Sequence, residues 1–232
     1  MVESVDTPDL KSVGHYARGS SSLPAPIDLI TMERHIQNIF PTAVGVCKNF
    51  LAEDQRKEVL DLCKSLEYKP IDSDDDTKSQ ISLDRSVLDY VPVIKTLMYQ
   101  DFLQYVQYIM NIVDADFRIG TSWTTKAPHK TQSDWHIHSN YFFSGVYYPE
   151  DSSPIIFKNQ LVDHYVFEFS GNTPYNSNTY THHPEKNSLV FFRSNLFHKI
   201  SKNTSENDRY SLAFNIMPVG DYGTGDGEIT VK

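Results

Sequence analysis

Three histidines and one arginine in the second half of the chain have the residue types and spacing of a metal site with an anion anchor. His136 and His138 are separated by one residue, and His198 and then Arg209 follow further along. Side chains two residues apart on a strand share a face, so a His-x-His pair can offer two ligands to one ion. A third imidazole from another strand can complete one face of a transition-metal site. The arginine adds a fixed cation that can bind a carboxylate through two hydrogen bonds.

Segments rich in aromatic and β-branched residues accompany each of these side chains. Residues 141–148 follow the His-x-His pair, residues 188–193 precede His198, and Arg209 opens a run that continues from residue 210 to residue 219. Such runs predict strands. The candidate groups therefore lie on or beside strands, as a site inside a barrel requires.

The first half of the chain predicts helices that pack against this sheet. The pattern indicates a flexible arm over residues 1–30, a strand within 36–47, an amphipathic helix over 52–66, a polar loop over 72–80, and one or two helices around Pro92 within 83–113. Strands follow Asp116 to the end of the chain. We expect a mainly β fold with buttressing helices at about 52–113, in a single domain over residues 31–232.

Composition narrows the classes of protein further. The 232 residues carry a formal net charge of −9, which argues against a broad nucleic-acid-binding surface. We find no secretory signal and no apolar run long enough to span a bilayer. The two cysteines, Cys47 and Cys63, do not form a disulfide framework of the small secreted type. We therefore expect a cytoplasmic protein without membrane contacts, and a homodimer is compatible with the sequence.

Four segments together resemble the iron(II)/2-oxoglutarate-dependent oxygenases, in particular a branch of bacterial and phage members. They are residues 38–42, residues 136–148, residues 187–192 with His198, and residues 209–216. The resemblance implies a double-stranded β-helix, or jelly roll. It also implies iron(II) as the metal and 2-oxoglutarate as the cosubstrate.

The resemblance assigns a role to each candidate residue. His136 would be the first iron ligand and His198 the distal one. Arg209 would pair with the distal carboxylate of 2-oxoglutarate, with help from the Ser211 hydroxyl, and Tyr148 would donate a hydrogen bond to the same carboxylate. Strand alternation places Tyr148 on the face opposite to that of Tyr147.

The chain departs from the family pattern at one position. The usual motif is His-x-Asp or His-x-Glu, and His138 occupies the position of the carboxylate. Either three histidines hold the metal, or His138 points aside and a carboxylate from elsewhere or water takes its place. We favour His138 as a ligand. The nearby carboxylates Asp134, Glu150 and Asp151 do not substitute easily, because Asp134 precedes the pair and the other two lie beyond the next strand.

The implied reaction consumes dioxygen and 2-oxoglutarate, releases succinate and CO2, and hydroxylates a C–H bond of a small-molecule or peptidyl substrate. Two alternatives are a three-histidine dioxygenase that uses no 2-oxoglutarate, and a non-catalytic jelly-roll protein that holds a structural ion. Arg209 and Ser211 discriminate between these hypotheses, because neither alternative needs a carboxylate anchor.

Overall fold

The computed structural model describes residues 37–38, 40–113, 115–160, 170–171 and 173–232. The arm predicted at residues 1–30 lies outside this part of the chain. Residues 42–232 form one compact unit, which is described here. Its elements are β1 (Gly45–Cys47), α1 (Glu53–Ser65), β2 (Tyr68–Pro70), β3 (Gln80–Ser82), η2 (Val87–Tyr90), α2 (Pro92–Gln104), η3 (Tyr105–Ile109), β4 (Asp116–Ala127), β5 (Phe143–Tyr148), β6 (Ile155–Lys158), β7 (Thr179–His182), β8 (Ser188–Arg193), β9 (His198–Ile200), β10 (Arg209–Tyr222), η4 (Gly225–Gly227) and β11 (Ile229–Val231).

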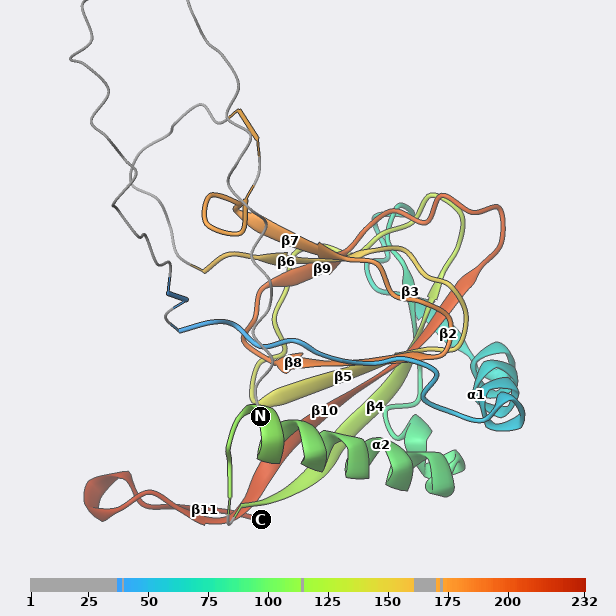
Figure 1. Cartoon of the computed structure of the whole chain (residues 1–232). Coiled ribbons are helices and arrows are strands. Elements are labelled where there is room, and N and C mark those ends of the chain that lie inside the picture. The colour runs from blue at the N-terminus through green and yellow to red at the C-terminus, as the bar shows by residue number, and fades with distance from the viewer. Residues whose placement is uncertain (1–36, 39, 114, 161–169, 172) are drawn as a thin grey trace, which may run out of the picture. The chain divides into compact units, whose positions relative to one another are not determined.

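Two antiparallel sheets face each other (Figure 1). The larger has the strand order β1-β8-β5-β10-β4-β3-β2, with β11 paired to β10, and the smaller has the order β7-β6-β9. The chain crosses from the large sheet to the small one between β5 and β6 and again between β8 and β9. It returns to the large sheet between β7 and β8 and between β9 and β10. The fold is the double-stranded β-helix, or jelly roll, that the sequence predicts.

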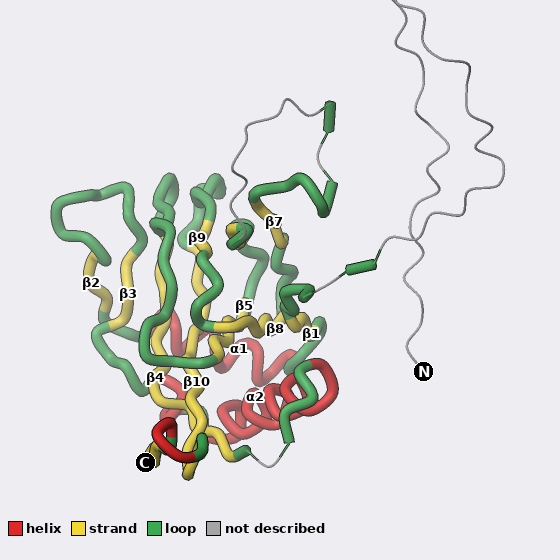
Figure 2. Tube along the Cα trace, turned by 90° about the vertical axis from the view of Figure 1, so that its left-hand side faces the viewer, coloured by secondary structure: helices red, strands yellow, loops and turns green. Residues whose placement is uncertain are grey.

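Helices α1 and α2 cover the face of the large sheet that is turned away from the small sheet (Figure 2). Aromatic side chains fill this layer. Phe102 of α2 makes edge contacts with Phe117 and Phe143 at ring-centroid distances of 5.2 and 5.4 Å. Within the described residues, no helix is long and apolar enough to cross a membrane.

Strand alternation sends the side chains of β5 to two different layers. Tyr147 belongs to the core beneath the helices, and Tyr148 and Val146 belong to the core between the two sheets. On the same face as Tyr147, Gly145 leaves room for the Phe214 ring of β10, because a Cβ at this position would lie 2.4 Å from that ring. The alternation predicted for the two tyrosines is therefore confirmed.

Three predicted elements differ from those observed. Only Gly45–Cys47 forms a strand among the described residues of the stretch 36–47. The strand predicted at 141–148 begins at Phe143, since Asn140 turns the chain with a φ of 68° just before it. The polar loop predicted at 72–80 joins two short strands, β2 and β3, that the sequence pattern does not predict, and its Asp75 pairs with Lys78 at 3.3 Å.

Candidate metal and anion site

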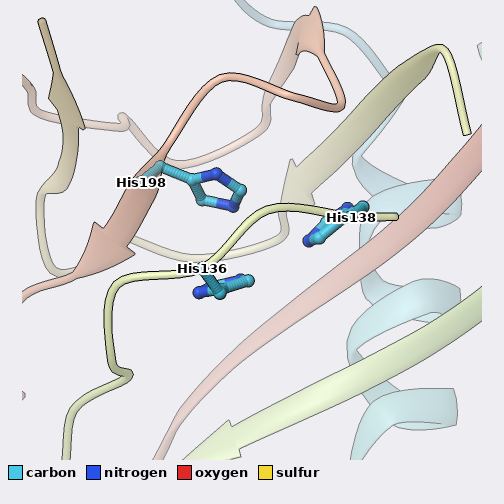
Figure 3. A group of neighbouring side chains, drawn as sticks. All are labelled: His136, His138 and His198. Carbon is cyan, nitrogen blue, oxygen red and sulfur yellow. The ribbon is translucent and has the colours of Figure 1, made fainter. Parts of the chain in front are cut away.

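The imidazoles of His136, His138 and His198 converge in the space between the two sheets (Figure 3). Their ring centroids lie 4.3 Å apart for His136 and His198, 5.3 Å for His136 and His138, and 5.1 Å for His138 and His198. One potential ligand atom from each ring lies within 4.8 Å of the other two. Among the residues that the structure describes, no other group of three or more His, Cys, Asp or Glu has this geometry.

Isolated backbone pairing, and not a regular strand, holds the His-x-His segment in place. His136 and His198 form a single antiparallel bridge, in which each backbone N–H donates to the other residue's carbonyl at 2.9 and 3.0 Å. The backbone N–H of His138 donates to the Ser194 carbonyl at 2.9 Å. The two ligand-bearing segments are therefore tied together directly, although only His198 belongs to a named strand.

An aromatic stack supports this bridge. Trp135 and Phe197, which precede the two bridged histidines, lie parallel with centroids 5.8 Å apart and an interplanar angle of 7°. The ammonium of Lys199 lies 5.0 Å from the centre of the Trp135 ring. Stacked aromatic pairs contribute roughly 0.5–1.5 kcal/mol beyond their buried area. The stack therefore helps to hold His136 and His198 at a fixed separation.

Hydrogen bonds at Nδ1 set the tautomer of His136 and His198. These atoms lie 2.8 Å from the carbonyl oxygens of Asp134 and Leu196, respectively. A carbonyl oxygen can only accept, so each Nδ1 carries the proton and each Nε2 keeps a free lone pair. A metal-binding histidine usually donates a hydrogen bond from the ring nitrogen that does not bind the metal, as these two do.

His138 obtains the same tautomer from a side chain. Its Nδ1 lies 2.7 Å from Oδ1 of Asn215 and 2.8 Å from Oγ of Ser144. Ser144 itself donates to Asn215 Oδ1 at 2.9 Å and lies 2.8 Å from the Ser194 hydroxyl. Because Asn215 Oδ1 accepts, the proton of a neutral His138 resides on Nδ1, and its Nε2 is also free.

Burial keeps two of these imidazoles neutral. Loss of solvation, together with the smaller effect of the neighbouring His136, lowers the pKa of His138 to about 4 and that of His198 to about 3. A metal binds only the neutral ring, so no proton has to leave these two side chains at neutral pH. Three convergent imidazoles with free Nε2 atoms suit a transition metal such as iron(II).

The carboxylates named as substitutes for His138 lie elsewhere. Asp134 pairs with Lys78 at 2.6 Å, and neither Asp134 nor Glu150 belongs to the histidine group. The geometry thus brings His138, and no carboxylate of the described residues, to the third position.

Arg209 begins β10 and is buried, with 5% of its surface exposed. Its Nη1 donates to Ser152 Oγ at 3.1 Å, its Nε has no hydrogen-bond partner, and no carboxylate of the described chain pairs with it. The hydroxyl of Tyr148 is likewise buried without a partner. Burial lowers the pKa of Arg209 and raises that of Tyr148, and each group partly offsets the shift of the other. Leu212 of β10 lies opposite Tyr147 of β5, so Arg209 and Tyr148 occupy nearby positions on two paired strands.

Unpartnered buried polar atoms are rare, because each costs about 1–3 kcal/mol. Two of them on neighbouring strands, one cationic and one a hydroxyl, indicate a place for an anionic ligand. The Ser211 hydroxyl, two residues along β10, makes no hydrogen bond within the described residues and can contribute to the same place.

One cavity of about 690 Å³ joins the metal-binding and anion-binding groups. His136, His138, His198, Arg209 and Ser211 all line it. Tyr148 is fully buried and is not one of the residues that line the cavity. The volume falls within the range of small-molecule sites, which is roughly 300–1,000 Å³.

Sequence reasoning missed the polar side chains that orient His138. Asn215 interrupts the apolar run of β10, and Ser144 precedes Gly145 in the apolar run of β5. A polar residue inside a buried strand is a detectable signal, because it needs a partner. The sequence alone does not show that the partner is a histidine 77 residues away.

The chain matches one family model and resembles many solved structures in its fold. Residues 121–215 match the family described as "Putative 2OG-Fe(II) oxygenase". No curated protein matches the chain. The matched stretch runs from β4 to β10 and includes all three histidines and Arg209.

Three solved structures illustrate the similarity of fold. A prolyl-4-hydroxylase from Pseudomonas putida has 17% identity and a TM-score of 0.53, over 82% of this chain and 95% of that one. HygX from Streptomyces hygroscopicus, with nickel and 2-oxoglutarate bound, has 12% identity and a TM-score of 0.51, over 76% and 83%. The α-ketoglutarate-dependent epimerase SnoN from nogalamycin biosynthesis has 11% identity and a TM-score of 0.59, over 82% and 89%.

Proposed function

We propose that this chain, which belongs to the 2OG-Fe(II) oxygenase family, is an iron(II)- and 2-oxoglutarate-dependent dioxygenase that hydroxylates its substrate. One observation carries the proposal: a buried arginine without a carboxylate partner lines the same cavity as three convergent histidines. A structural ion would need only the histidines. The arginine adds a site for the second carboxylate of a keto-acid.

The residues divide into two groups with separate tasks. His136, His138 and His198 would hold iron(II) through their Nε2 atoms, and the bound metal would supply the oxidation in which 2-oxoglutarate is converted to succinate and CO2. Arg209, Ser211 and Tyr148 would bind the distal carboxylate of 2-oxoglutarate and so orient its keto-acid end towards the metal. The structures of HygX with nickel and 2-oxoglutarate and of SnoN with Fe3+, α-ketoglutarate and nogalamycin RO support this pairing of groups in the fold.

Anaerobic titration of the iron(II) protein with 2-oxoglutarate tests the proposal. Chelation of iron by the keto-acid produces a charge-transfer absorption band, so the band should appear and saturate at one equivalent. Absence of the band in a protein that retains its iron would refute the proposal.

The three-histidine donor set favours one competing function, a dioxygenase that acts without a keto-acid. A carboxylate ligand would remove one charge from the metal centre, and His138 does not. This alternative predicts no band on titration and oxygen consumption that is independent of 2-oxoglutarate.

Replacing His138 by alanine is expected to weaken iron binding by at least about tenfold, because one of three donors is lost. Aspartate at the same position should restore much of the affinity, since its carboxylate can act as a donor. Equilibrium dialysis against iron(II) under anaerobic conditions measures both. If the alanine variant binds iron as tightly as the parent, His138 is not a ligand.

Asn215 is expected to act on the metal through His138. Asn215→Leu removes the acceptor that holds the Nδ1 proton, and loss of such partners typically costs about 10- to 100-fold in metal affinity. Asn215→Asp has a similar size and keeps an oxygen acceptor, so it should bind iron within a few-fold of the parent. Equal losses in the two variants would mean that Asn215 only supports packing.

Tyr148→Phe is expected to raise the melting temperature of the protein without 2-oxoglutarate, because it removes a buried hydroxyl that has no partner. The same change should weaken 2-oxoglutarate binding several-fold, since a neutral hydrogen bond contributes about 0.5–1.5 kcal/mol. Thermal denaturation with and without 2-oxoglutarate gives both effects. A lower melting temperature without ligand would show that the hydroxyl stabilises the fold itself.

A further inference from the structure

We infer that the substrate carries an anionic group, a carboxylate or a phosphate, beside a flat apolar part, and that Lys69 and Arg85 bind the anion while Trp123 contacts the apolar part. The inference rests on the proposed function for the position of the reacting atom. The binding of the anion itself can be tested without any turnover.

The charge of the cavity is opposite to that of the chain. The protein has a formal net charge of −9, yet the cavity that contains the histidines is lined by four basic side chains and one acidic side chain, which are Lys69, Lys78, Arg85, Arg209 and Asp134. A cavity with this balance raises the local concentration of anions.

Two of the four basic side chains, Lys78 and Arg209, already have a partner or a proposed ligand. Lys78 is bound between Asp134 at 2.6 Å and Asp75 at 3.3 Å, with a side chain only 13% exposed. It anchors the β2–β3 loop to the segment that precedes His136, where Ser79 also donates to the Gln132 carbonyl at 3.0 Å. Arg209 is the proposed anchor of 2-oxoglutarate.

Lys69 and Arg85 remain available. Neither side chain has a hydrogen bond, ion pair or aromatic contact within the described part of the chain. Both are exposed, so they can exchange water for a ligand at low cost. Two uncompensated cations that line the cavity beyond the edge of β4 opposite to β10 suit a single anionic group.

The sheet register places Lys69 three strands away from Ser211, and so at the far end of the cavity from the proposed carboxylate anchor. Ser211 of β10 lies opposite Thr125 of β4, Thr125 lies opposite Ile81 of β3, and Ile81 lies opposite Lys69 of β2. All four line the cavity. Adjacent strands are about 4.8 Å apart, so Lys69 lies roughly 14 Å from Ser211 across the sheet.

Arg85 lies beside the same edge of β4 as β3, because the opposite edge of β4 pairs with β10. Its carbonyl accepts from the backbone N–H of Ser122 at 2.8 Å, and Ser122 is the neighbour of Trp123 on β4. Arg85 is thus about one strand spacing beyond the strand that carries Trp123.

Trp123 lies between these cations and the metal-binding group. Its indole lines the cavity and meets the His138 ring edge-on, with centroids 5.4 Å apart. Ile71 and Ile81 add apolar surface on the side of the β2–β3 hairpin. A flat apolar group is the natural partner of this half-buried indole, so this part of the substrate would extend from the anion towards the histidines.

Indole fluorescence can report on this region alone. The chain has two tryptophans, and Trp135→Phe leaves Trp123 as the only one while keeping an aromatic ring opposite Phe197. The anaerobic iron(II) form of this variant, saturated with 2-oxoglutarate, is titrated with 3-phenylpropionate, 3-phenylpropyl phosphate, the neutral 3-phenylpropanamide and the cationic 3-phenylpropylamine. A Trp123→Phe variant shows how much of the signal comes from the cavity.

We expect at least one of the two anionic probes to change the fluorescence at concentrations about tenfold lower than the amide, and the amine to bind worst. The stronger of the two anions identifies carboxylate or phosphate. Lys69→Gln together with Arg85→Gln should abolish the preference for anions, whereas Lys158→Gln, a charge change outside the cavity, should keep it.

Three results would overturn the inference: no preference for an anion over the amide, a preference that survives in the Lys69→Gln/Arg85→Gln variant, or a preference that is lost only in Arg209→Ala. The charge-transfer band with 2-oxoglutarate is a separate readout of the proposed function. A band without an anion preference contradicts this inference alone. An anion preference without a band supports the binding site and contradicts the keto-acid.

Discussion

Replacing either His136 or His198 by alanine is expected to abolish stoichiometric iron binding. Each imidazole offers one of three donors, and the bridge between the two residues sets the position of both. Loss of a partner that only orients a ligand costs about 10- to 100-fold in affinity, so loss of the ligand itself should cost more than about 100-fold. Metal content after anaerobic dialysis, with circular dichroism to follow the fold, measures the effect.

The exposed His183 provides a matched control, because it lies outside the histidine group. His183→Ala should bind iron like the parent. His198 is buried, so its removal also leaves a cavity, and His198→Gln keeps more of the volume while changing the donor. If the His136→Ala and His198→Ala variants both retain stoichiometric iron, the metal site is assigned wrongly.

The strands that carry the site could be predicted because their side chains are buried on both faces. Residues 188–193 are predicted as a strand and observed as β8 with the same bounds. A continuous run of large apolar residues fits such a central strand, which packs on helices on one side and on the small sheet on the other. The assignment of Tyr147 and Tyr148 to opposite faces follows from the same two-residue period.

The segment around His136 could not be predicted in the same way. The conformation of this segment is held by a single bridge to His198 and by the stack of Trp135 on Phe197, which are contacts between distant parts of the chain. The hydrogen bond from His138 to Asn215 also depends on how β5 and β10 align, and a sequence pattern does not specify register between strands that are far apart. The residue types of a site can thus be recognised before the contacts that orient them.

Arg209→Ala is expected to weaken 2-oxoglutarate binding by about ten- to hundredfold while leaving iron binding nearly unchanged. A charge-assisted hydrogen bond contributes roughly 1.5–3 kcal/mol, and each ~1.4 kcal/mol corresponds to a factor of ten in affinity. Arg209→Lys should recover only part of the loss, because an ammonium lacks the two parallel donors of the guanidinium. Titration of the charge-transfer band gives the affinity, and anaerobic dialysis gives the iron content. Arg118→Ala, at an exposed position on β4, serves as a control and should match the parent. If Arg209→Ala forms succinate with an unchanged apparent constant for 2-oxoglutarate, the buried guanidinium has another partner. The choice then returns to the two functions that need no keto-acid.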